Sequence, residues 1–245
     1  MGINLGGMTD VGLRRQNNQD CFFIKELAES FVLMIVCDGM GGANGGSEAS
    51  SLAAEEFASY VEKNIVRGRT DEYLPILENA LVEANKKVVE MSESSKELRG
   101  MGTTLVCALL DTDCYYCLWV GDSRIYAITP NGLLQISHDH SYVQTLVDNG
   151  SITPEEALVH PNRNIITKAV GTEKNISADV SKMSMESIDG LLLCSDGLCG
   201  YVDENEIFCI CKEVRDAGDC CRALVELANS NGGPDNITVV VHKKH

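Results

Sequence analysis

Four aspartates lie beside apolar, strand-like runs of the chain, and each is followed by a small or polar residue. The first of them, Asp38, comes directly after the apolar run 31–37 and is followed by Gly39. Asp-Gly is a common turn dipeptide, so one such junction indicates no more than a strand and a turn. The same kind of junction recurs and predicts one site where carboxylates from distant segments meet, namely Asp38, Asp122, Asp196 and Asp235.

A cluster of carboxylates suits divalent metal ions. Without cations between them, the carboxylates would repel one another and resist ionisation, so their gathering is best explained as a metal site. A set of oxygen ligands favours Mg²⁺ or Mn²⁺ over Zn²⁺. Because Gly39 has no Cβ, its backbone carbonyl can come close to whatever Asp38 binds.

The polar loop at 12–20 has the sequence GLRRQNNQD and precedes a predicted strand at 21–24. Arginine can offer a planar, bidentate fork to a phosphate group. We therefore expect one arginine of this loop to contact phosphate, whereas ordinary solvated turn chemistry accounts for Arg14.

Hydrophobic periodicity predicts an α+β fold. Apolar residues recur at helical spacing over 47–65 and 74–91, so these segments are expected to be helices that bury one face. Paired strand-like runs joined by short polar turns indicate antiparallel hairpins. Further strands are predicted at 103–110, 114–120, 125–128, 133–136, 177–184, 191–194 and 237–242, and further helices at 141–149, from 153, after 203 and at 219–229.

Length and charge narrow the class of protein. The 245 residues can bury one large core, and no linker, repeat or low-complexity run divides 1–245, so one domain is expected. The net charge of -16 argues against nucleic acid and against an anionic membrane surface, because both require a basic face. No apolar run is long enough to span a bilayer, and we expect a soluble, cytoplasmic monomer.

The 11 cysteines are odd in number and scattered through apolar segments, unlike a disulfide framework. We interpret the cysteines as small, buried hydrophobic residues. The alternative is a structural zinc site. Cys114 and Cys117 form a CxxC, but on a predicted strand positions i and i+3 point to opposite faces. The second candidate group falls on helical patterns without paired CxxC sequences, and consists of Cys209, Cys211, Cys220 and Cys221.

Three histidines, His138, His140 and His160, could act as bases or metal ligands. Since the carboxylates already specify a site, loop hydrogen bonding or substrate contact is the favoured interpretation for them.

Taken together, these motifs resemble those of the metal-dependent protein phosphatases of the PPM/PP2C family, in particular the compact bacterial Ser/Thr phosphatases. The likeness covers essentially the whole chain. It implies a four-layer α-β-β-α sandwich of two antiparallel sheets flanked by helix pairs, with a variable flap at about 143–164 that bears on substrate choice. The matching segments occur in the family's order and read TDVGLRRQNNQD, DGMGG, MGTT, GDSRIY, HPNRNIITKAVG, SDGL and PDNITVVV.

The resemblance also implies roles for individual residues. Asp38 would bridge two metal ions, the Gly39 carbonyl would bind the second ion, and Asp196 with Asp235 would hold the first. Arg15 would grip the substrate phosphate.

Two further aspartates complete the implied set of two or three Mn²⁺ or Mg²⁺ ions. Asp20 would support the metals through water, and Asp122 would join Asp196 at a third ion. A water bridging two ions would lose a proton near neutral pH and attack phosphorus in line. The implied reaction is hydrolysis of phosphoserine and phosphothreonine on proteins phosphorylated by an opposing Ser/Thr kinase.

One departure from the family pattern leaves a second interpretation open. Many relatives have histidine after DGMGG, proposed to protonate the leaving oxygen, but here that position is Ala43, followed by Asn44. The alternative is a catalytically weak or inactive relative that binds phosphoproteins as a regulator, although all the matched acids are present. A nucleotide-binding loop is disfavoured, because Asn44 stands where a dinucleotide fingerprint needs Gly and no P-loop Lys follows.

Overall fold

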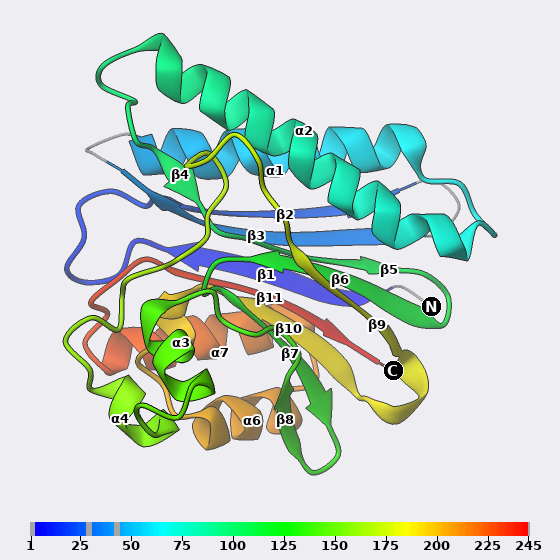
Figure 1. Cartoon of the computed structure of the whole chain (residues 1–245). Coiled ribbons are helices and arrows are strands. Elements are labelled where there is room, and N and C mark those ends of the chain that lie inside the picture. Colours follow the sequence, from blue (N-terminus) through cyan, green and yellow to red (C-terminus); the bar gives the residue numbers. More distant parts are fainter. Residues whose placement is uncertain (1–2, 28–30, 42–44, 245) are drawn as a thin grey trace.

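The computed structural model describes residues 3–27, 31–41 and 45–244. Two antiparallel sheets pack face to face, and helices cover the outer surface of each (Figure 1). The predicted α+β class and the α-β-β-α order of layers are therefore confirmed.

The first sheet has the strand order β1-β11-β10-β7-β8. Its strands are β1 (Asn4–Asp10), β7 (Arg124–Thr129), β8 (Gly132–Gln135), β10 (Gly190–Cys194) and β11 (Ile237–Lys243). The second sheet runs β2-β3-β5-β6-β9, and a short strand β4 also pairs with β3. Its strands are β2 (Asp20–Glu26), β3 (Val32–Met40), β4 (Gly102–Thr103), β5 (Leu105–Leu110), β6 (Cys114–Val120) and β9 (Asp179–Ser184).

Each sheet carries its own pair of longer helices (Figure 1). The second sheet is covered by α1 (Gly45–Asn64) and α2 (Tyr73–Ser94), and the first by α6 (Glu204–Glu213) and α7 (Ala217–Ser230). The remaining helical segments are short: η2 (Thr70–Glu72), α3 (Tyr142–Asp148), α4 (Pro154–Leu158), η3 (Met185–Ser187) and α5 (Asp196–Cys199).

Burial on both faces explains the unbroken apolar run of β3. Leu33, Ile35 and Cys37 pack against α1 and α2, whereas Val32 and Val36 pack between the two sheets. The same alternation separates Cys114 from Cys117 on β6, because the first contacts the helix side and the second lies between the sheets. The prediction that this CxxC points to opposite faces is confirmed.

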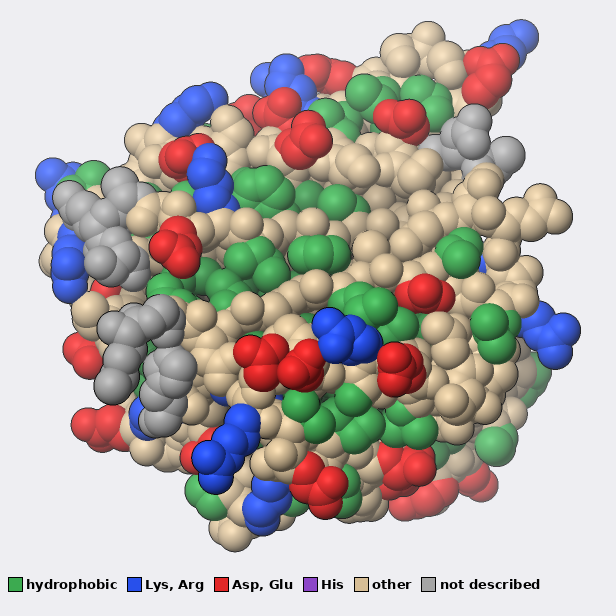
Figure 2. Space-filling model, turned by 180° about the vertical axis from the view of Figure 1, so that it is seen from behind, with side chains coloured by type: hydrophobic (Ala, Val, Ile, Leu, Met, Phe, Trp, Pro, Cys, Tyr) green, Lys and Arg blue, Asp and Glu red, His purple; other side chains and the backbone are tan. Residues whose placement is uncertain are grey.

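The surface carries charges of both signs. Figure 2 shows one face, on which acidic and basic side chains lie singly or in small groups among apolar and polar ones. Within the described part of the chain, no helix has the length and apolar character needed to cross a membrane.

Two predicted elements differ from the structure, one at each end of the sandwich. The expected strand 103–110 is interrupted at Thr104, which exchanges hydrogen bonds with Asp38: the Thr104 amide donates to the Asp38 carbonyl and the Asp38 amide donates to Thr104 Oγ1, both at 2.9 Å. The helix expected at 219–229 begins at Ala217, because the side chain of Asp216 accepts from the Asp219 amide as its cap.

We predict that Leu77→Ala lowers the free energy of unfolding by about 2–5 kcal/mol, since it opens a cavity between α2 and the sheet. The Leu77 side chain is fully buried, whereas Val82 on the same helix is half exposed. Val82→Ala is the matched control, and we expect it to stay within about 0.5 kcal/mol of the wild type. Urea unfolding followed by circular dichroism measures both, and equal losses would contradict the layer arrangement.

Candidate active site

The chain segments that carry the predicted carboxylates meet at the end of the sandwich away from the two termini, which is on the left in Figure 1. Asp20 begins β2 and lies directly opposite Asp38 in the antiparallel register of β2 and β3. Asp196 opens α5 immediately after β10, and Asp235 and Asp122 lie two residues before β11 and β7.

The pKa of Asp38 reports how close these groups are. It is raised well above the usual value, first by burial and then by the negative charges of Asp20, Asp196, Asp122 and Asp235. The four other carboxylates therefore all act on Asp38, as expected for like charges in a poorly solvated site.

Asp20 is buried and only half satisfied. Its Oδ2 accepts a hydrogen bond of 2.7 Å from Ser195 Oγ, whereas its Oδ1 is buried without a partner among the described residues. Burial is the main reason that the pKa of Asp20 is raised to about 7.

Asp196 and Asp122 show the same pattern. Burial, and then the charge of Asp235, raise the pKa of Asp196, and its Oδ1 is also buried without a hydrogen-bond partner in the described part of the chain. Burial, followed by the charges of Asp196 and Asp139, raises the pKa of Asp122 to about 8.

Arg15 brings positive charge to the site. Its Nη2 donates to Asp235 Oδ2 at 2.8 Å, and about half of the arginine side chain is exposed. Burial would lower the pKa of Arg15, but the hydrogen bond to Asp235 and the charges of Asp235, Asp196 and Asp38 outweigh it and raise the pKa. The guanidinium is thus held at the rim of the cluster with one edge open to solvent.

Two glycines let backbone segments approach the site closely. A Cβ on Gly39 would lie 2.0 Å from the carbonyl oxygen of Gly46, which belongs to the first turn of α1. A Cβ on Gly197, in α5, would lie 1.8 Å from the carbonyl oxygen of Asn236. Any side chain at either position would push apart the segments that carry Asp38, Asp196 and Asp235.

Several polar residues that organise the site were missed in the sequence. Asn236 receives a 2.8 Å hydrogen bond from the Gln19 amide at its Oδ1 and donates to the carbonyls of Val11 and Asn17 at 3.0 Å, so it holds the loop that carries Arg15. Ser195 anchors Asp20. The sequence signal that could have identified Asn236 and Ser195 is their position directly beside Asp235 and Asp196, in the motifs PDN and SDG.

The three histidines make loop contacts. His138 Nε2 lies 2.8 Å from an oxygen of Asp148, His140 Nδ1 accepts from the Gly121 amide at 3.1 Å, and His160 Nδ1 accepts from a neighbouring loop amide. His140 therefore helps to fix the turn before Asp122. The expected flap contains α3 and α4, and α4 begins with a capping box between Thr153 and Glu156.

The donor set fits hard divalent cations. Among the described residues, no three His, Cys, Asp or Glu side chains are already arranged to hold a metal ion. Ser195 occupies one oxygen of Asp20, and Arg15 occupies one oxygen of Asp235. The orphaned oxygens of Asp20 and Asp196 are acceptors that a cation would satisfy.

Comparison with known proteins gives the family. Residues 13–229 match the family model of protein phosphatase 2C. The chain belongs to the protein phosphatase 2C family. Phosphatases of this family depend on metal ions, and the expectation of an enzyme of this family is confirmed.

Individual relatives agree along nearly their whole length. The chain is 36% identical over 237 residues to a serine/threonine phosphatase stp of Listeria welshimeri, covering 97% of this chain and 94% of the relative. The crystal structure of serine/threonine phosphatase Stp1 from Staphylococcus aureus superposes with a TM-score of 0.94 at 36% identity, covering 100% and 96% of the two chains. The catalytic domain of serine threonine protein phosphatase PstP, solved with two manganese ions, gives 0.84 at 33% identity and 98% and 97% coverage.

We predict that the metal-free protein loses stability as the pH rises from about 4 to about 8. The pKa values of Asp20, about 7, and Asp122, about 8, lie above the ordinary 3.8, so in this window the folded protein binds protons that the unfolded chain has released. Asp122→Asn should remove part of this loss, on the order of a few kcal/mol at pH 8. Urea unfolding in EDTA at a series of pH values measures the difference, and a difference that does not change with pH would contradict it.

Proposed function

We propose that this phosphatase hydrolyses phosphoserine and phosphothreonine on proteins with the help of bound Mn²⁺ or Mg²⁺. The supporting observation is the gathering of five carboxylates at one end of the sandwich, four of them with pKa values raised chiefly by burial, and two of them with a buried oxygen that has no hydrogen-bond partner among the described residues. Such a cluster is stable in the ionised form only with cations among the oxygens. The relatives named serine/threonine phosphatases and the manganese in the PstP structure support the same function.

The ligands proposed for these ions are the residues that the family resemblance implies. Asp38 would bridge two ions, the Gly39 carbonyl would face the second, and Asp196 with Asp235 would hold the first. Asp20 would act through water, and Asp122 would join Asp196 at a third ion. When bound, the ions would lower the pKa of water and neutralise charge on the phosphoryl oxygens.

Arg15 would bind the phosphate of the substrate. Its guanidinium already sits beside Asp235 with about half of its surface open, so it can turn free N–H groups toward a phosphate at the rim. Asn236 would keep this loop in place through its hydrogen bonds to the backbone of 11–19. The arginine would thus orient the phosphate and offset its negative charge in the transition state.

We further propose that residues 1–245 act as one catalytic domain, as a cytoplasmic monomer whose substrates are phosphorylated by an opposing Ser/Thr kinase. The flap at about 143–164 would contact those substrates.

The alternative, a weak or inactive relative that binds phosphoproteins, has one observation in its favour, Ala43 in place of histidine. Ala43 lies outside the described residues.

We predict that chelator abolishes hydrolysis of an aryl phosphate and that Mn²⁺ or Mg²⁺ restores it. Asp38→Asn and Asp196→Asn should each lower kcat by at least about a hundredfold, because each removes a ligand whose charge no neighbour replaces. Phosphate release from the aryl phosphate and from phosphothreonine peptides is the measurement.

The matched control is Glu78→Gln, which removes a carboxylate from the exposed face of α2 and should leave the rate unchanged. Full activity after chelation would contradict the metal mechanism. Metal-dependent binding of phosphopeptide without release of phosphate would favour the regulator instead.

We predict that Ala43→His raises the rate more for phosphoserine peptides than for activated aryl phosphates. A seryl oxygen is a poor leaving group and benefits from a proton donor, whereas an activated phenolate leaves without one. A gain of about tenfold or more on the peptide is expected. Equal effects on both substrates, measured as kcat, would show that no acid is missing at this position.

A further inference from the structure

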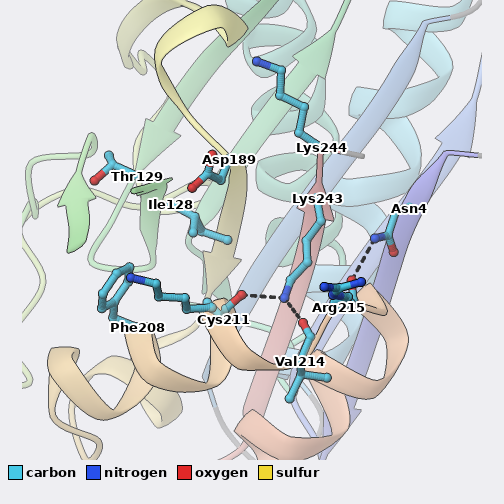
Figure 3. A pocket seen from close by; sticks show the side chains of 11 residues that line it. Asn4, Ile128, Thr129, Asp189, Phe208, Cys211, Val214, Arg215, Lys243 and Lys244 are labelled. Atoms are coloured by element: carbon cyan, nitrogen blue, oxygen red, sulfur yellow. Dashed lines mark hydrogen bonds between the residues drawn. The ribbon is translucent and has the colours of Figure 1, made fainter. Parts of the chain in front are cut away.

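A pocket of 440 Å³ opens at the end of the sandwich opposite the carboxylates (Figure 3). It lies where β1 and β10 begin and where β7 and β11 end, beside α6. Its lining includes Asn4, Asp189, Phe208, Cys211 and Lys243.

Four cationic residues line the pocket, and the amines of the three lysines among them already contact other groups of the protein. Lys212 lies over the ring of Phe208 at 5.3 Å, and Lys244 Nζ donates to the Met185 carbonyl at 2.6 Å. Figure 3 shows the amine of Lys243 directed at the carbonyls of Cys211 and Val214. Cys211 is also part of the pocket wall.

Lys243 places a buried positive charge behind this wall. Its side chain reaches from the end of β11 to the last turn of α6, where Nζ donates to the carbonyl of Cys211 at 2.6 Å and to that of Val214. Only 7% of the residue is exposed. The ammonium thus stabilises the negative end of α6.

Two thiols meet beside this ammonium. Cys220, in the first turn of α7, has its Sγ 4.0 Å from Sγ of Cys211. Both residues are buried and both thiols are free. The hydrogen bond with Cys211 and the charge and hydrogen bond of Lys243 lower the pKa of Cys220, against the effect of burial. The N-terminus of α7 adds favourable positive charge.

The pair is a thiol site and not a metal site. Cys221 lies next to it in sequence, but no group of three metal-ligating side chains is found here or elsewhere among the described residues. Other buried cysteines lack the cation: burial raises the pKa of Cys107 well above its usual value and that of Cys117 to about 12. Low thiol pKa and a partner sulfur within reach are the features of an oxidisable pair.

We propose that Cys211 and Cys220 form a reversible disulfide when the protein meets hydrogen peroxide, which enters through the pocket. The site is independent of the phosphatase reaction, because neither cysteine contacts the carboxylate cluster at the other end of the sheets.

The chemistry balances in two steps. The thiolate of the pair attacks one peroxide oxygen, the O–O bond breaks, and with one proton the products are a sulfenic acid and water. The second thiol then attacks the sulfenic sulfur, the S–S bond forms, and the hydroxyl leaves with the thiol proton as water. Two electrons pass from the two sulfurs to the peroxide, and a thiol reductant reverses the bond.

The test uses the full chain and substoichiometric hydrogen peroxide, followed by alkylation and peptide mass spectrometry. We expect a cross-linked peptide pair containing Cys211 and Cys220 with the loss of two hydrogens, which dithiothreitol reverses. Exposed Cys209 reports that peroxide reached the protein, and Cys107 and Cys117 are the buried internal controls. Free Cys211 and Cys220 after Cys209 has been oxidised would overturn the proposal.

Variants test the role of each group. In Cys211→Ser the sulfenic acid has no partner, so Cys220 should gain one oxygen and no cross-link should form. Lys243→Gln should slow disulfide formation about tenfold, because it removes the positive charge that favours the thiolate, while Lys243→Arg should keep the rate. Should Lys243→Gln not fold, wild type, Lys243→Arg and Cys211→Ser still test the proposal. Oxidation of Cys107 and Cys117 at the same rate as Cys211 and Cys220 would overturn the assignment.

Discussion

Like charges buried together are the constraint on which this structure depends. Asp38 faces four other carboxylates, and burial alone already raises its pKa. Ionised carboxylates in such a place need compensation from hydrogen-bond donors and cations. The protein supplies part of it, through Ser195 on Asp20 and Arg15 on Asp235, and one buried oxygen each of Asp20 and Asp196 has no partner among the described residues. That unmet demand is the physical basis for assigning divalent ions to this end of the fold.

The sandwich can hold such a cluster because its central strands are buried on both faces. β3 packs on helices at one face and on the opposite sheet at the other, so the backbone around Asp38 cannot shift to relieve repulsion. The interruption at Thr104 adds hydrogen bonds to both the amide and the carbonyl of Asp38. Close contact at Gly39 and Gly197 fixes the neighbouring segments. Rigidity of this kind keeps oxygen atoms at fixed positions for a ligand.

Much of this was readable from the sequence, because the signals were local. The apolar run before Asp38, the helical spacing of 47–65 and 74–91, and the hairpin turns each predict one element, and these elements formed within a few residues of their expected ends. The links of Ser195 to Asp20 and of Asn236 to the loop at 11–19 join residues far apart in the sequence. No periodicity encodes such contacts, since they arise only when β10 and β11 come to lie beside the start of β2. The break at Thr104 has the same origin.

The two ends of the same sheets deal with charge in opposite ways. At one end, five carboxylates lie near Arg15, and the function proposed for the site supplies further cations from solution. At the other end, Lys243 is buried at the last turn of α6 and its amine is used by two carbonyls and by the thiol of Cys220. A positive charge that is already satisfied attracts no anion into the pocket, but it still favours a thiolate over a thiol next to it. With Cys211 as a second sulfur at 4.0 Å, oxidation of the pair is the chemistry that this arrangement favours.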